Sequence, residues 1–166
     1  MGNPGVVHSP EEAMSIDEIY GALDTLSADF EAEARICETE RRPTEALANL
    51  MRQARTPLAK FPRVLGGCEI HPAEQVDFFS RIAYLNPTAG WLAFNQCGVL
   101  GLIGATFTEE GLEEIFAKTP CPLVAAVSAP TGRSQKVDGG YKVSGRWAYA
   151  SGATCADYVL LVPICE

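Results

Sequence analysis

Cysteine and histidine are the residues of this chain that could bind a metal ion or act as nucleophiles. The six cysteines are widely spaced and form no C-x-x-C pair: Cys37, Cys68, Cys97, Cys121, Cys155 and Cys165. Both histidines, His8 and His71, lie far in sequence from any pair of cysteines. No metal-site spacing, Cys-His set or Ser-His-Asp set is present. We expect no metal, and buried, reduced thiols in a cytoplasmic protein.

Trp91 and Asn95 are candidates for a shared binding surface, because residues four apart lie on one face of a helix. They lie in an apolar stretch, where a buried amide must find a hydrogen-bond partner. Asn95 therefore either bonds a neighbouring helix or, together with Trp91, contacts a small-molecule substrate. The residues alone leave both readings open.

Composition narrows the class of protein. Of the 166 residues, 47% are hydrophobic and 20% are charged, which is typical of a soluble globular chain. The formal net charge of −8 argues against nucleic acid and against anionic membranes as partners. The apolar stretch 90–107 is long enough to span a bilayer, but acidic Glu109 and Glu110 follow it, which favours a helix buried in protein.

The first part of the chain has helical periodicity. Ser15 and Glu18 form an S-x-x-E capping pattern at the start of an amphipathic helix that reaches about Glu40. Further helices are predicted over 46–54, from Pro72, from Pro87 and after a Thr108 cap. The helix that begins at Pro87 is apolar on all sides and is expected to be central.

The pattern changes near Thr119. Short strands are predicted at 123–127, around Val137, at 141–147 and at 158–162, with a hairpin turn at Asp138-Gly139-Gly140. We expect an α+β chain: a helical domain over 1–118 and an incomplete β domain over 119–166. The unpaired strand edges predict further protein, on the same chain or on a partner. A small α+β protein that closes its own sheet is the alternative.

Two segments of the β part resemble acyl-CoA dehydrogenases. The run Ser128-Ala129-Pro130-Thr131-Gly132-Arg133-Ser134-Gln135 aligns with the T-E-P-x-A-G-S-D signature of that family. The run Gly145-Arg146-Trp147-Ala148-Tyr149-Ala150-Ser151-Gly152, followed by Ala156-Asp157, aligns with G-x-K-x-W-I-[ST]-N and A-D. Upstream, residues 61–67 and 87–91 are similar to a loop and to the start of the central helix. The resemblance covers about residues 45–162.

Departures from the dehydrogenase pattern point to one branch of the fold. Ala129, Arg133 and Gln135 differ from the corresponding residues of the T-E-P-x-A-G-S-D signature. The amino-acid sequence of 125–157 is most similar to the oxygenase components of two-component flavin-dependent monooxygenases. A histidine that some members carry on the central helix is missing, since this stretch reads Phe94-Asn95-Gln96-Cys97-Gly98.

The resemblance implies an antiparallel β-barrel as the complete middle domain and a C-terminal helical bundle that this chain lacks. It also implies flavin (FAD or reduced FMN) as the cofactor, O2 as the co-substrate and a flavin reductase as a possible partner. An acyl-CoA dehydrogenase and a non-catalytic subunit are the alternatives. A homo-oligomer, or a partner chain that completes the fold, would supply the parts of the flavin site that this chain lacks.

The resemblance assigns roles residue by residue. Ser151 is the catalytic candidate, because its hydroxyl would bond near flavin N5 and can both donate and accept. Tyr149 would lie on the same strand, project to the same side and pack on the flavin ring. The implied cofactor-binding set is Ala126, Val127, Ser128, Tyr149, Ala150 and Ser151.

The substrate set is Trp91, Asn95 and Ser134, the last beside Arg133, which suits phosphate. Ordinary structural roles compete with each assignment: a serine that satisfies a turn, a core aromatic residue, a plain buried strand and a solvent-facing arginine.

Overall fold

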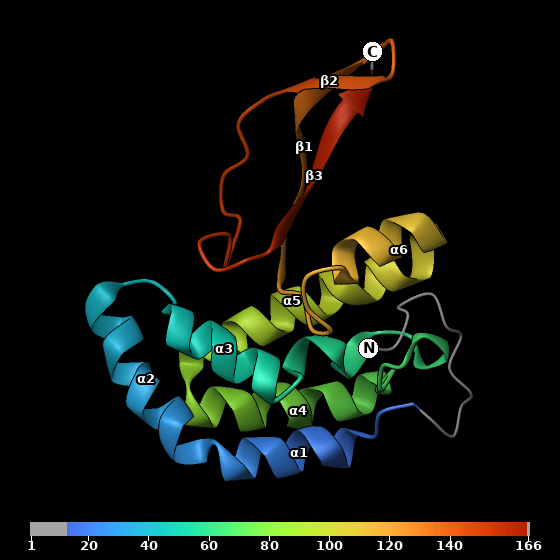
Figure 1. Cartoon of the computed structure of the whole chain (residues 1–166). Coiled ribbons are helices and arrows are strands. Elements are labelled where there is room, and N and C mark those ends of the chain that lie inside the picture. The colour runs from blue at the N-terminus through green and yellow to red at the C-terminus, as the bar shows by residue number, and fades with distance from the viewer. Residues whose placement is uncertain (1–12, 166) are drawn as a thin grey trace.

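The structure is a computed structural model that describes residues 13–165, a layer of helices from which a narrow sheet projects (Figure 1). Within that range six α-helices precede three strands. The helices are α1 (Ile16–Thr25), α2 (Ser27–Glu40), α3 (Glu45–Gln53), α4 (Pro72–Leu85), α5 (Pro87–Thr106) and α6 (Glu109–Phe116). Two short 3₁₀ segments, η1 (Thr56–Lys60) and η2 (Arg63–Leu65), connect α3 to α4. The strands are β1 (Val124–Val137), β2 (Gly140–Ser144) and β3 (Tyr158–Cys165).

Side-chain caps start most of the helices, as the sequence predicted. Ser15 accepts from the Glu18 amide at the start of α1, and Thr108 accepts from Gly111 at the start of α6. Pro72 and Pro87 are the first residues of α4 and α5, where the missing proline N–H costs nothing.

The single helix predicted over 16–40 is divided in the structure. α1 ends at Thr25 and α2 begins at Ser27, with Leu26 between them at φ −98° and ψ 8°. The Ser27 hydroxyl donates to the Asp24 carbonyl at 3.0 Å, so it competes with the helical backbone ladder at this point. The hydrophobic periodicity continues across the break, which is why the sequence alone indicated one helix.

α5 is the central helix, with contacts to α2, α3, α4, η1 and β1. Gly90 allows α4 and α5 to approach closely, since a Cβ there would lie 2.5 Å from the Cβ of Ala83. The expectation of burial on every side is wrong for one face, where Trp91, Phe94 and Leu102 are more than half exposed. In the part of the chain that the structure describes, no helix meets the length and hydropathy needed to cross a bilayer.

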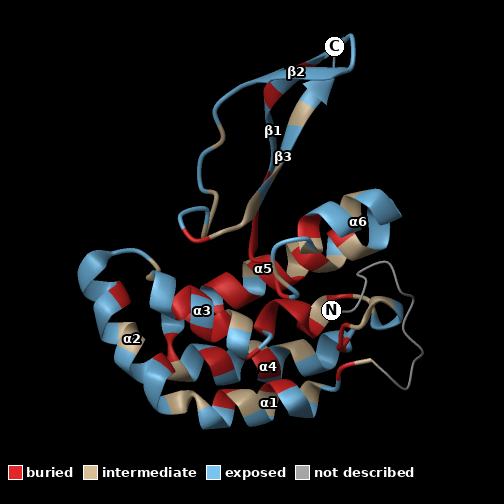
Figure 2. Ribbon diagram, in the orientation of Figure 1, coloured by how far each residue is buried: buried red, intermediate tan, exposed pale blue. Residues whose placement is uncertain are grey.

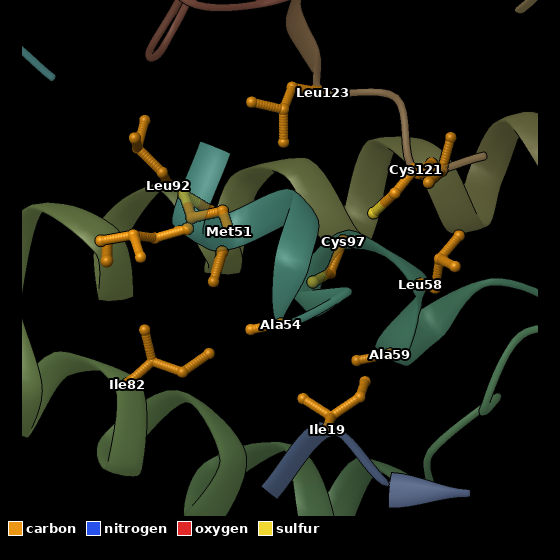
Figure 3. Close-up of a cluster of buried hydrophobic side chains, with 14 of the residues drawn as sticks. Ile19, Met51, Ala54, Leu58, Ala59, Ile82, Leu92, Cys97, Cys121 and Leu123 are labelled. Atoms are coloured by element: carbon orange, nitrogen blue, oxygen red, sulfur yellow. The ribbon is translucent and has the colours of Figure 1, made fainter. Parts of the chain in front are cut away.

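One continuous hydrophobic core lies between the helices and reaches the base of the sheet (Figures 2 and 3). Figure 3 places Ile19, Met51, Ile82 and Cys97 around a common centre, with Leu123 of the segment before β1 above them. Most of the rest of the sheet is exposed or half-buried, as Figure 2 shows. The core therefore belongs to the helical part.

The sheet differs from the expected part of an antiparallel barrel. It has three strands in the order β2-β1-β3, and β1 pairs antiparallel with β2 but parallel with β3. The strands predicted at 123–127 and around Val137 form a single strand, because β1 continues through 128–131. Its register against β3 shifts between Val127 and Gly132. The predicted strand 141–147 ends at Ser144. The described residues close no barrel. The hairpin turn predicted at Asp138-Gly139-Gly140 is confirmed: Val137 pairs with Gly140, and two residues lie between them.

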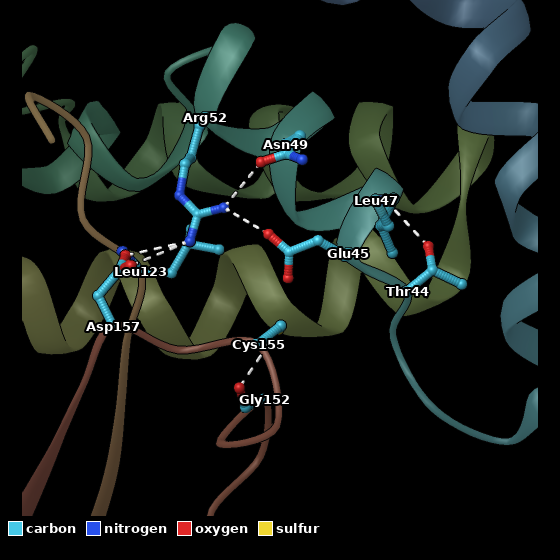
Figure 4. Close-up of polar contacts among 9 residues, drawn as sticks. All are labelled: Thr44, Glu45, Leu47, Asn49, Arg52, Leu123, Gly152, Cys155 and Asp157. Carbon is cyan, nitrogen blue, oxygen red and sulfur yellow. Dashed lines mark hydrogen bonds and ion pairs between the residues drawn. The ribbon is translucent and has the colours of Figure 1, made fainter.

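A clamp of polar contacts fixes the sheet to the helices (Figure 4). The Arg52 guanidinium of α3 donates to both carboxylate oxygens of Asp157 at 3.2 Å. Asp157 also accepts from the Leu123 amide at 2.8 Å and donates its own amide to the Leu123 carbonyl. Both charged side chains are about one-fifth exposed (20% and 21%). One carboxylate therefore joins α3, the entry to β1 and the entry to β3.

The cysteines are free thiols, and five of the six are buried as expected, while Cys165 is exposed. Burial raises the pKa of Cys121 to about 12, and it raises the pKa of Cys97 further. The Cys97 thiol donates to the Thr56 carbonyl at 2.9 Å. These thiols are therefore protonated core residues at neutral pH.

The clamp predicts a large local contribution to stability. We expect Asp157→Ala to lower the free energy of unfolding by about 2 kcal/mol, because Arg52 loses its two-oxygen acceptor, while it keeps Asn49 and Glu45, and the Leu123 amide loses its side-chain acceptor. The matched control is Asp24→Ala, which removes a more exposed ion pair with Arg81 and should cost under about 1 kcal/mol. Urea unfolding measures both, and equal losses would contradict the assigned importance of the clamp.

The buried thiols predict a loss of stability at alkaline pH. Their pKa values are raised on folding, so the stabilisation is complete below the unfolded value near 9 and is lost as pH rises toward 12. Between pH 8 and 10, each of Cys97 and Cys121 should lower the free energy of unfolding by about 1 kcal/mol. Urea unfolding under reducing conditions should show a smaller pH dependence for Cys97→Ala and Cys121→Ala. Parallel curves for parent and variants would rule this out.

Candidate functional site

The candidate site lies where the exposed face of α5 meets the turn over residues 149–155. The Trp91 indole Nε1 donates to the Ser151 hydroxyl at 3.1 Å, which joins residues 60 apart in the sequence. Trp91 is 59% exposed and Ser151 is half-buried, so the pair borders the surface. The Ser151 proton has no acceptor among residues 13–165 and is free to donate to a ligand.

Aromatic rings extend the site along α5. Trp91 stacks on Phe94 with ring centroids 6.1 Å apart, and Phe94 meets Phe79 of α4 edge-on at 5.4 Å. Phe94 is 56% exposed, so flat apolar surface adjoins the Ser151 hydroxyl. Sequence reasoning missed Phe79 and Phe94, although their apolar character on successive helices is visible in the sequence.

Tyr149 and Ser151 do not share a strand, which corrects the predicted geometry. Residues 145–150 leave the ladder, and Tyr149 has a left-handed φ of 63° with its side chain 97% exposed. The Ser151 amide donates to the Tyr149 carbonyl at 2.9 Å, which makes a tight local turn. The alternating pattern ends at Ser144, so spacing by two no longer places side chains on one side.

The turn is held from beneath by Cys155. Its amide and its thiol both reach the Gly152 carbonyl, at 3.0 and 3.3 Å. Burial raises the pKa of Cys155, so its thiol remains a hydrogen-bond donor at neutral pH. Ala150 is half-buried in the same turn.

The predicted pyrimidine-edge residues lie on β1. Ala126 and Val127 pair with Leu160 and Leu161 of β3, and Ser128 begins the irregular stretch that ends at Gly132. On its other side β1 pairs with β2 only from Arg133 onward. The edge of 124–131 opposite β3 therefore carries no strand within the described residues.

The remaining substrate candidates are distributed differently. The Asn95 amide donates to the Trp91 carbonyl at 2.7 Å, so its donor serves the helix beneath the site. Ser134 lies apart from α5: it is 4% exposed, pairs with Val143 and Cys165 in the sheet, and donates to the Cys165 thiol at 3.2 Å. The structure thus brings together Trp91, Asn95 and Ser151, but not Ser134.

Gln96 adjoins the site and was missed as a site residue. Its side chain is fully buried against Gly152, and both polar atoms lack a partner in residues 13–165. A glutamine on an otherwise apolar helix was the available signal. No group of three or more metal-ligating side chains occurs in the described part of the chain, and His8 lies outside it.

Relatives of known class match most of the chain. A pigment production hydroxylase from Rhodococcus erythropolis is 31% identical over 87% of this chain and 36% of its own length. The FADH2-dependent resorcinol hydroxylase, oxygenase component, of a Rhizobium species is 29% identical over 95% of this chain and 39% of its own length. No protein-family model matches the chain.

The HsaA monooxygenase from Mycobacterium tuberculosis has the same fold. Its crystal structure superposes with a TM-score of 0.77 at 24% identity, over 92% of this chain and 40% of that chain. The fold is thus that of the N-terminal portion of acyl-CoA-dehydrogenase-like proteins. The chain matches part of the oxygenase components of two-component flavin-dependent monooxygenases, over less than half of their length.

The hydrogen-bonding and aromatic groups of the site are of the kinds that one edge of a flavin would contact. A flavin offers ring atoms that accept and donate hydrogen bonds, and flat faces that favour aromatic contact. The residues of matching type are Ser151 with its unused proton, the strand edge of β1 that β2 does not cover, and the exposed Trp91 ring.

Trp91 predicts a spectroscopic signal for the site. Trp147 is the other tryptophan of the chain, so a Trp147→Phe background isolates Trp91 emission. We expect Ser151→Ala in that background to shift the emission maximum, because the indole N–H loses its acceptor. Ser144→Ala, an exposed serine on β2, is the control and should cause no shift. An unchanged Ser151→Ala spectrum would mean that the contact is not populated.

Proposed function

We propose that this chain is the flavin-contacting front part of a monooxygenase oxygenase component, which uses reduced flavin and O2 to hydroxylate a small molecule. The observation that carries the proposal is the bond from Trp91 to Ser151, which leaves the serine proton free beside aromatic surface. The relatives reported above are hydroxylases and monooxygenases by name, which supports this reaction class over others.

Each residue of the site has a definite task under this proposal. Trp91 orients the Ser151 oxygen, so that the serine proton points away from α5 toward the flavin N5 edge. The unpaired edge of β1 at Ala126, Val127 and Ser128 offers backbone groups to the pyrimidine end of the ring. Tyr149 and Ala150 lie beside Ser151 and cover the ring from solvent. Bound reduced flavin would supply the electrons that activate O2.

The substrate would lie on the Trp91 side of the ring. Exposed aromatic surface at Trp91 and Phe94 suits a flat apolar molecule. The stretch 94–98 of α5 has no histidine or charged side chain, and burial raises the pKa of the Cys97 thiol, so it supplies no base at neutral pH. A proton acceptor for the substrate must come from elsewhere in the whole protein.

Partners follow from the same proposal. A reductase would deliver reduced flavin, and a second copy, a partner chain or further sequence of the same protein would cover the exposed apolar residues of α5 and the sheet. An acyl-CoA dehydrogenase remains the second use of this fold, but no specific contact of the described residues favours it.

A flavin titration tests the proposal. The protein, with any sequence that continues its reading frame, should be purified colourless and titrated anaerobically with FADH2 and FMNH2 in the Trp147→Phe background. We expect saturable quenching of Trp91 emission, and about five- to tenfold weaker binding for Ser151→Ala, since one hydrogen bond to the ring is lost. Ser144→Ala is again the control.

Two results would count against the monooxygenase assignment. Tightly held oxidised flavin that is reduced by an acyl-CoA would indicate a dehydrogenase. A protein that binds neither reduced flavin would remove the basis for a catalytic role.

A further inference from the structure

Among residues 13–165, Gln96 is the side chain whose buried polar atoms have no hydrogen-bond partner. Its side chain is 0% exposed, and neither Nε2 nor Oε1 has a hydrogen-bond partner in residues 13–165. Asn86, another fully buried amide, donates to the Phe30 carbonyl and accepts from the Ala89 amide. Buried amides in native proteins are nearly always bonded in this way. The exception at Gln96 therefore needs an explanation.

The carboxamide of Gln96 faces the turn that carries Ser151. A Cβ built on Gly152 would lie 3.1 Å from Gln96 Nε2 and 2.8 Å from a methyl carbon of Leu92. Gly152 also has a left-handed φ of 81°, so backbone conformation and close packing both favour glycine here. The Gly152 carbonyl is engaged by Cys155, but the Gly152 amide has no acceptor in the described residues. The backbone N–H of Gly152 and the side-chain amide of Gln96 therefore both lack a partner, and the two residues are neighbours in the structure.

We propose that Gln96 is a positioning residue for Ser151, which acts through the backbone of Gly152 when a ligand occupies the site. In the ligand-bound arrangement the turn 149–155 settles on α5, and Gln96 Oε1 accepts from the Gly152 amide. Ser151 is covalently next to Gly152, so its hydroxyl is fixed at the same time. A ligand that binds this arrangement more tightly shifts the turn toward it, and the new bond offsets part of the ordering cost. This inference rests on the proposed function, because it needs a ligand at Ser151.

Gln96→Met separates the polar role of the side chain from its packing. Methionine is close to glutamine in length and shape but carries no amide. Without ligand, the variant should melt about 2–4 °C higher, since an unsatisfied buried amide has been removed. With FADH2, its affinity measured by Trp91 emission should be about fivefold weaker, because the bound arrangement loses one hydrogen bond. A residue that only fills space would not move these two readouts in opposite directions.

Gln75→Met is the matched control, because Gln75 donates to the Ile70 carbonyl away from the site. It should lower the melting temperature and leave flavin affinity unchanged. If Gln96→Met binds FADH2 as tightly as the parent, or melts at a lower temperature without ligand, the inference is overturned while the proposed function stands. If the parent binds no reduced flavin, the proposed function fails, and the inference fails with it.

Discussion

The ion pair between Arg52 and Asp157 anchors the base of the sheet to the helices. Most of the sheet is exposed, so it is held at its base, where Leu123 and Val124 are buried in the core and the Asp157 carboxylate joins α3 to Leu123. Asp157 directly precedes β3 and follows the turn at 149–155. The same contact that fixes the sheet therefore also brings Ser151 back to α5, where Trp91 meets it.

α5 has two roles that its composition does not separate. One face, with Leu92, Cys97, Leu100 and Ile103, belongs to the core of the helical layer. The opposite face keeps Trp91 and Phe94 exposed beside the turn. Burial of the first face is what holds the second in place, so the aromatic part of the site is built on a helix, while Ser151 lies in the turn. A rigid support of this kind limits the geometric freedom of the aromatic contacts.

Stability and binding oppose each other at the base of the turn. The buried amide of Gln96 costs free energy in the ligand-free protein, and an apolar side chain of similar shape would remove that cost. A group that is unsatisfied until a ligand binds can favour the bound arrangement, which would explain a polar residue in an otherwise apolar environment. Cys155 acts in the opposite sense, since it satisfies the turn in either state.

Local patterns in the amino-acid sequence were enough to predict the helix starts at Ser15, Pro72, Pro87 and Thr108, the hairpin turn at Asp138-Gly139-Gly140, and the resemblance to flavin-dependent oxygenases. These features depend on helix caps, turn residues and short sequence motifs, each of which is specified by residues that are close together in the chain. The folded structure was needed to show that 16–40 is two helices, that β1 pairs parallel with β3, that Tyr149 and Ser151 leave the strand pattern, and that the Gln96 amide has no partner in residues 13–165. Each of these depends on contacts between residues distant in the chain or on competition for backbone hydrogen bonds, which periodicity does not encode.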